Sequence, residues 1–111
     1  MMMIEDDIVK RIVYSKIGGP ESIEIIDEEL GKPNNNQVKV RVYRAGINFA
    51  DLMMRQGLYG SNPDFPFTPG YETSGIIIET GDEVKKLEIG ERVIAMTGFG
   101  GYAEEVIVDS S

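Results

Sequence analysis

The hydrophobic residues of this chain recur mostly in short runs, many of them with a period of two, which is the pattern of β-strands. Within residues 38–43, three valines alternate with Lys39, Arg41 and Tyr43, and this alternation predicts a strand with one buried face. Runs rich in β-branched and aromatic residues predict further strands at 10–14, 23–26, 74–80, 92–96 and 102–109.

One segment has helical spacing. Asn48 is a favoured N-cap, Asp51 follows in the first turn, and Gly57 is placed to end the helix, so the helix is predicted over residues 48–56. The i, i+3, i+4 spacing predicts an apolar stripe formed by Phe49, Leu52 and Met53.

Glycine and proline separate these elements, with turn signals at 18–21 and 81–82 and a proline-containing loop at 60–69. Several short strands, glycine-rich turns and one short helix predict a small, mostly-β barrel. The length of 111 residues suits one domain. We therefore treat residues 1–111 as a single domain.

The amino-acid composition excludes several kinds of catalytic and metal-binding site. The chain contains no cysteine and no histidine, which excludes a Ser-His-Asp triad, a cysteine nucleophile and a zinc site of Cys and His ligands. We expect no metal site. The net charge of −8 disfavours nucleic acid and anionic lipid as partners, and no apolar run is long enough to span a membrane. The acidic first ten residues do not resemble a secretory signal, and we expect a cytoplasmic, soluble protein.

Residues 98–103 match the Gly-x-Gly-x-x-Ala pattern of dinucleotide-binding turns. That pattern needs a helix after the glycines to face the pyrophosphate, whereas a strand is predicted here. A glycine-rich connection between two strands is the better interpretation.

Three polar residues are candidates for a site. Asn48 and Asp51 form either a simple helix cap or a carboxamide and carboxylate at a pocket edge, and the two interpretations are compatible. Tyr59 is either a packing residue or a hydroxyl donor to a carbonyl oxygen. Glu72 would need a partner if buried, and the candidates are Arg44, Arg55 and Arg92.

Four sets of segments, in this order and spacing, carry a family resemblance. They are residues 18–21, residues 44–51 with 55–59, residues 69–75 with 81–82 and 90–93, and residues 100–104. Together they resemble the GroES-like domain of quinone oxidoreductases, the zeta-crystallin branch of the medium-chain dehydrogenases/reductases. The resemblance implies a GroES-like, partly open β-barrel with one or two short helices.

Zinc-dependent alcohol dehydrogenases of the same superfamily carry a cysteine where this chain has Asn48 and a histidine where it has Tyr71. Neither residue would replace a zinc ligand, so the resemblance is to the zinc-free branch. It implies an NADPH-dependent oxidoreductase that transfers hydride to a quinone or another α,β-unsaturated carbonyl, in a protein that acts as a homodimer.

The resemblance also implies roles for individual residues. Asn48 would contact the nicotinamide or the carbonyl group, Tyr59 would polarise the carbonyl, and Asp51 would contact the cofactor or orient its neighbours. The Rossmann domain that binds NADPH is absent from this chain, and the segment alone is expected to be inactive. Alternatives are a 2-enoyl thioester reductase of the same superfamily and a non-catalytic GroES-like binding module.

Overall fold

The computed structural model describes residues 8–60 and 63–111. Most of the acidic N-terminal run, and residues 61–62 of the predicted loop, lie outside the described residues. The strands are β1 (Ile8–Tyr14), β2 (Ile23–Glu29), β3 (Gln37–Ala45), β4 (Glu72–Thr80), β5 (Arg92–Met96) and β6 (Glu105–Asp109). Within these residues, one α-helix, α1 (Phe49–Arg55), follows β3, and a single 3-10 turn, η2 (Pro20–Ser22), precedes β2.

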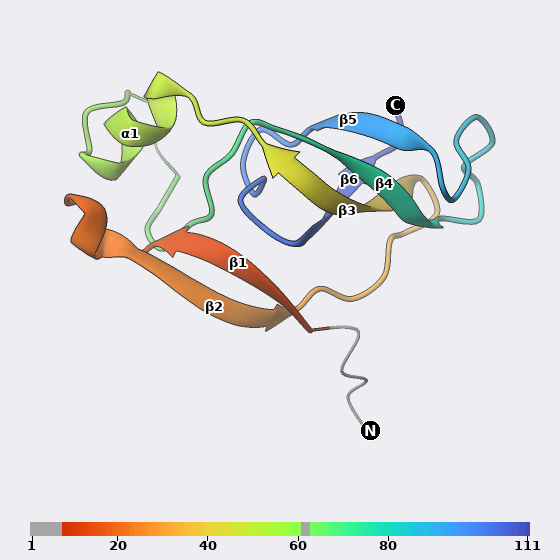
Figure 1. Ribbon diagram of the computed structural model, residues 1–111, viewed down its shortest axis with the longest axis horizontal. Helices are drawn as coiled ribbons and strands as arrows, with labels where there is room; N and C mark the ends of the chain where they lie inside the picture. The colour runs from red at the N-terminus through yellow and green to blue at the C-terminus, as the bar shows by residue number, and fades with distance from the viewer. Residues whose placement is uncertain (1–7, 61–62) are drawn as a thin grey trace.

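The strands form two antiparallel sheets (Figure 1). β1 pairs with β2, and the second sheet has the order β5-β4-β3-β6. β3 is central, so that Val38 lies opposite Thr80 of β4 on one side and Val108 of β6 on the other. The predicted mostly-β fold with one or two short helices is confirmed, and the sheets remain open. In the described ranges, no helix is long and apolar enough to cross a membrane.

The four-stranded sheet carries an aliphatic cluster. Its buried members are Val38, Val40, Ile77 and Val106, and Val40 and Ile77 are fully inaccessible to solvent. These residues come from three neighbouring strands and interlock on one face of the sheet. The cluster therefore explains why the alternation of valines in β3 is needed.

The alternation also led to one wrong expectation, because Lys39 is buried and not exposed. Its ammonium group donates to the carbonyl of Gly31 and lies 3.7 Å from a carboxylate oxygen of Glu79. A buried ammonium is tolerated when it is paired and hydrogen-bonded in this way. Both faces of β3 are thus covered at this position.

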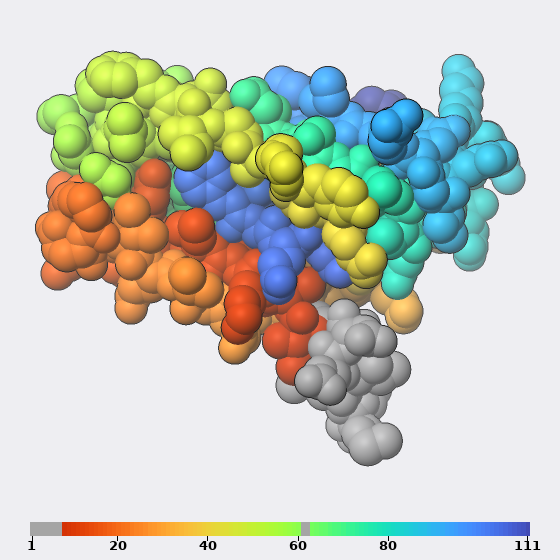
Figure 2. All heavy atoms as spheres, in the orientation of Figure 1, coloured from red at the N-terminus to blue at the C-terminus, as the bar shows by residue number. Residues whose placement is uncertain are grey.

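The segment between β5 and β6 joins the two sheets. Ile12 of β1 donates its N–H to Tyr102 at 2.9 Å, and Val42 of β3 donates to Glu104 at 2.8 Å. In Figure 2 this segment (blue) lies between β1 (red-orange) and β3 (yellow). The strand predicted at 102–109 therefore begins later, at Glu105, because the preceding residues bond to both neighbours as a connection.

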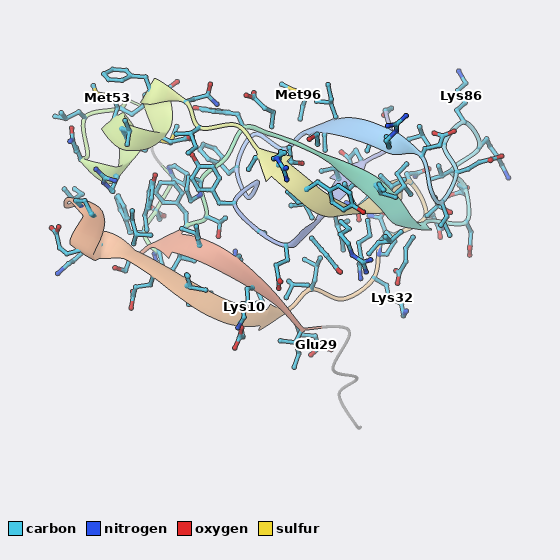
Figure 3. All side chains as sticks on the ribbon, in the orientation of Figure 1. Lys10, Glu29, Lys32, Met53, Lys86 and Met96 are labelled. Atoms are coloured by element: carbon cyan, nitrogen blue, oxygen red, sulfur yellow. The ribbon has the colours of Figure 1, made fainter. Side chains whose placement is uncertain are left out.

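Helix α1 turns an unexpected face inward. The predicted stripe is largely exposed, with Phe49 74% and Leu52 38% accessible, whereas Asp51 and Met54 are buried. Met53 of this stripe lies on the outer side of α1 in Figure 3. The stripe prediction is wrong because the helix packs on an aromatic cluster through Met54. The carboxylate of Asp51 can be buried beside that cluster because it is hydrogen-bonded.

The aromatic cluster is the second core of the molecule. Its buried members are Tyr14, Met54 and Phe67, with Ala50, Phe65 and Tyr71 packed around them. The Tyr14 and Phe67 rings meet edge to face with centroids 5.5 Å apart, a favourable geometry for aromatic pairs. The site candidates all lie around this cluster, away from the aliphatic one.

Candidate functional site

Asp51 is the centre of the polar network beside α1. It forms a capping box with Asn48, in which its Oδ2 atom accepts the Asn48 backbone N–H at 3.0 Å. The same Oδ2 accepts the hydroxyl of Tyr102 at 2.7 Å. The Asp51 side chain is only 1% exposed, and its Oδ1 atom has no hydrogen-bond partner in the described part of the chain. Asp51 therefore caps the start of α1 through its side chain, in agreement with the capping interpretation of this pair.

The Asn48 carboxamide points toward β4. Its Nδ2 atom donates to Glu72 Oε1 at 3.4 Å, and the side chain is half-buried. The Glu72 carboxylate occupies the space beside Gly46, where any Cβ would clash with it. Asn48 thus provides the contact for Glu72, while Arg55, one of the arginines considered as its partner, donates to the carbonyl of Gly18 at 3.3 Å.

Tyr59 follows the end of α1, where Gly57 has φ +75° and stops the helix as predicted. Its ring is 38% exposed. The phenol of Tyr59 is hydrogen-bonded to that of Tyr71. This hydrogen bond is the main reason that the pKa of Tyr71 is raised to about 12, and burial adds to the shift. The Tyr71 ring in turn lies against Phe99, with centroids 5.9 Å apart. Tyr59 is therefore partly exposed to solvent while its phenol is hydrogen-bonded to Tyr71.

The pKa values of two more tyrosines, Tyr102 and Tyr14, depend in part on Asp51. Burial, followed by the hydrogen bond to Asp51, raises the pKa of Tyr102. Burial, followed by the charge of Asp51, raises the pKa of Tyr14, while Arg55 acts in the opposite direction. Because these values lie above the ordinary tyrosine pKa, both phenols stay protonated at neutral pH and can act as hydrogen-bond donors.

Residues 98–103 connect β5 to β6, and no helix follows them. Gly101 donates its N–H to Gly70 at 3.1 Å, and Tyr102 donates to Pro69 at 3.0 Å, so the turn is held against the segment before β4. The interpretation as a strand connection is confirmed, and the match to a dinucleotide-binding turn is a coincidence of spacing.

Other parts of the molecule offer less for chemistry. A groove of about 680 Å³ runs beside β1 and β3, lined among others by Lys39, Glu79 and Glu104, and lies away from α1. Among the residues that the structure describes, no cluster of three or more carboxylate, His or Cys ligands could hold a metal ion. The network around Asp51 is therefore the best candidate site.

The structure places the candidates named from the sequence in two sets of contacts, one at the start of α1 and one after its end. Asn48 contacts Asp51 and Glu72, and Tyr59 contacts Tyr71, which is next to Glu72 in sequence. Tyr102 was missed as a site residue, because its contact with Asp51 joins positions 51 residues apart. No local pattern in the sequence points to that pairing.

Comparisons with known proteins identify the family of this chain. Residues 34–111 match the family model of the alcohol dehydrogenase GroES-like domain. The chain is 38% identical over 98 residues to the human synaptic vesicle membrane protein VAT-1 homolog-like, covering 88% of the chain and 23% of that protein. It is 45% identical over 86 residues to the bovine quinone oxidoreductase-like protein 2, covering 77% of the chain and 25% of that protein.

Among solved structures, the Escherichia coli quinone oxidoreductase complexed with NADPH superposes with a TM-score of 0.83 at 33% identity. That match covers 91% of this chain and 31% of the bacterial enzyme. The chain thus spans about a quarter of the length of the curated relatives named above. By sequence and by fold, the chain belongs to the alcohol dehydrogenase GroES-like domain family, in the quinone oxidoreductase branch of the medium-chain dehydrogenases/reductases.

Proposed function

We propose that this chain contributes the substrate-binding half of an NADPH-dependent oxidoreductase that transfers hydride to a quinone or another α,β-unsaturated carbonyl. One observation carries the proposal: a hydroxyl and a carboxamide, those of Tyr59 and Asn48, lie on either side of α1, and neither residue is fully buried. Both groups donate hydrogen bonds, which is what a carbonyl oxygen that gains negative charge requires.

The donor set fits a nicotinamide and a carbonyl substrate. The Asn48 carboxamide is half-buried yet not fully enclosed, and the Tyr59 ring is 38% exposed, so each can reach a ligand. NADPH, when bound, supplies the hydride. The residues of this chain contribute hydrogen bonds and orientation, and the phosphate-binding turn belongs to a Rossmann domain outside this chain.

Tyr59 has the central chemical role in this proposal. Its hydroxyl hydrogen donates to the substrate oxygen, while its own oxygen is hydrogen-bonded to Tyr71. As hydride reaches the substrate, negative charge develops on that oxygen, and the hydrogen bond from Tyr59 Oη strengthens. In the absence of histidine, a phenol is a suitable neutral donor.

Asn48 orients the nicotinamide or the reacting carbonyl through its carboxamide. Asp51 was expected to contact the cofactor or to orient its neighbours, and its 1% exposure favours the second role. By accepting the Asn48 N–H, Asp51 fixes the residue that precedes α1. We therefore assign Asp51 to positioning.

The direct test uses the full-length protein, with Asn48→Ser and Tyr59→Phe compared with wild type. Serine keeps a good N-cap and removes the carboxamide, and phenylalanine keeps the ring and removes the hydroxyl. Each change is expected to lower kcat/KM for a soluble quinone by tenfold or more, about 1.4 kcal/mol of transition-state stabilisation, with little change in Tm.

The matched control is Tyr43→Phe, which removes a hydroxyl from an exposed tyrosine of β3 (57% accessible). It should leave kcat/KM unchanged. If Asn48→Ser and Tyr59→Phe both reduce the quinone at wild-type rates, the two residues are only a cap and a packing residue, and the site assignment is wrong.

The same proposal includes a weak affinity of the isolated chain for NADPH, since residues 98–103 form no phosphate cradle. Calorimetric titration of the 111-residue chain should show no binding tighter than about 1 μM, equivalent to roughly −8 kcal/mol. We further propose that the full-length protein is a cytoplasmic homodimer, which size-exclusion chromatography with light scattering and cell fractionation would test.

A further inference from the structure

Tyr102 is held unusually firmly for a residue in a strand connection. Its N–H donates to Pro69 at 3.0 Å, and its carbonyl accepts the N–H of Ile12 at 2.9 Å. Its ring lies against Gly70, where an added Cβ would come within 2.8 Å of Tyr102 Cδ1. Both sides of its backbone and one face of its ring are therefore fixed before the hydroxyl makes any contact.

The hydroxyl of Tyr102 then contacts the start of α1. It donates to Asp51 Oδ2 at 2.7 Å, within the short range expected for a hydrogen bond to a carboxylate. The acceptor is 1% exposed, so this bond operates away from water and is worth more than a surface contact. Tyr102 thus connects a rigid strand connection to the first turn of a short helix.

The same Oδ2 atom also receives the backbone N–H of Asn48 at 3.0 Å. A shift of the Asp51 carboxylate would therefore move the main chain of Asn48 and, with it, the carboxamide that donates to Glu72 Oε1 at 3.4 Å. The order of contacts runs from Tyr102 through Asp51 to Asn48. No contact of Tyr102 with the Asn48 carboxamide is involved.

We propose that Tyr102 is a positioning residue of the reductase, which sets the direction of the Asn48 carboxamide by fixing Asp51 at the start of α1. The proposal rests on the function proposed above. It predicts that loss of the Tyr102 hydroxyl lowers activity only through Asn48. The Tyr102 hydroxyl is already bonded to Asp51, so its loss is expected to lower kcat through Asn48 and to leave KM nearly unchanged.

The test is a double-mutant cycle in the full-length protein, with Tyr102→Phe placed in both the wild-type and the Asn48→Ser backgrounds. In the wild-type background, Tyr102→Phe is expected to lower kcat at least fivefold. In the Asn48→Ser background it should change kcat less than twofold, since the carboxamide that it positions is gone. A residue with a merely structural role would lower kcat by the same factor in both backgrounds.

Each outcome of the cycle is decisive. Equal losses in the two backgrounds, no loss in either, or a Tyr102→Phe protein that does not fold would each overturn the proposal. In the last case the Tyr102 hydroxyl would be required for folding and not for positioning Asn48. If Asn48→Ser alone has no effect and Tyr59→Phe also has none, the proposed function fails; if only Tyr102→Phe lacks an effect, the positioning role fails and the function stands.

A second measurement tests the contact itself on the 111-residue chain, without any activity. Phenolate absorbance is followed through an alkaline titration of wild type, Asp51→Asn, Tyr102→Phe and the double variant. Asp51→Asn should lower the pKa of the Tyr102 phenol, although burial still keeps it above the ordinary tyrosine value, and most of the resulting change in the titration curve should be absent when Tyr102 is replaced by phenylalanine. If Asp51→Asn shifts the same amount of phenol with Tyr102 present or absent, Tyr102 is not linked to Asp51 in solution.

Discussion

The two cores of this domain differ in chemistry. The aliphatic cluster on the four-stranded sheet consists of Val38, Val40, Ile77 and Val106. The aromatic cluster beside α1 contains Tyr14, Met54 and Phe67, and it borders a buried carboxylate and several phenols. The first cluster can only pack, whereas the second also has hydrogen bonds and charge to satisfy. Purely apolar packing and buried polar contacts are thus separated within one small domain.

This separation has a physical cause. A buried polar group is tolerated only when its hydrogen bonds are made, and a network of such groups fixes one geometry. Side chains that must be aligned for a reaction benefit from that constraint, while a sheet face needs only shape complementarity. The following changes test how strictly the two regions divide these tasks.

The largest loss of stability is expected from the aliphatic cluster. Ile77→Ala removes a fully buried side chain and leaves a cavity between neighbouring strands. The free energy of unfolding should fall by about 2–5 kcal/mol. Urea denaturation followed by circular dichroism measures it. Ile94→Ala on β5, at an exposed position (76% accessible), is the matched control and should change stability by less than about 0.5 kcal/mol.

A smaller loss is expected from the polar network. Asp51→Ala leaves the Tyr102 hydroxyl and the Asn48 N–H without their acceptor and removes the capping box. Unfolding should become easier by about 1–3 kcal/mol. Asp51→Asn keeps an acceptor oxygen and should cost less. An Asp51→Ala protein as stable as wild type would show that the network contributes nothing to the fold.

The sequence anticipated these two regions unequally. The alternating valines near Val40 located β3 and its buried face, because a period of two is a local property of the chain. The inward face of α1 was predicted wrongly, since the i, i+3, i+4 spacing placed Phe49 on the apolar stripe and did not include Met54 or Asp51. Only the tertiary contact with Tyr102 explains why Asp51 can be buried.

The same argument applies to the site. Asn48 and Tyr59 could be proposed from short motifs and from a family resemblance, and their catalytic roles remain proposals. Tyr71 could be identified only as a departure from a zinc-ligand position. Its hydrogen bond with Tyr59 depends on how the loop after α1 returns to β4. Contacts between distant segments of this kind leave no periodic signal in a single sequence.

Alkaline pH tests the stability contributed by the aromatic and polar region without any mutation, because the aliphatic cluster contains no tyrosine. The pKa of Tyr71 is raised to about 12 and that of Tyr102 is also raised, above the value near 10 of an unfolded tyrosine. Between these values the folded state binds more protons than the unfolded state, so stability falls as pH rises above about 10. Below about pH 10 these tyrosines do not make the free energy of unfolding depend on pH. Urea midpoints measured from about pH 8 to about pH 11 should decline more gently in Tyr102→Phe than in wild type.

The smallest effect is expected outside both cores. Lys10 and Asp27 form a 2.8 Å ion pair between β1 and β2, with side chains 62% and 61% exposed. Lys10→Gln should change the free energy of unfolding by less than about 1 kcal/mol, and that difference should shrink further in high salt. A loss as large as that of Asp51→Ala would mean that the surface of the two-stranded sheet matters as much as the buried network.

The position of β6 beside β3 has a consequence for how the protein is made. The two strands pair from Gln37 with Asp109 to Arg41 with Glu105, although all of α1, β4 and β5 is translated between them. During synthesis one edge of β3 therefore stays unpaired until the residues of β6 have left the ribosome. Such an edge can pair with other nascent chains. The domain is therefore vulnerable to misassembly in the cell during the interval between the release of β3 and the release of β6.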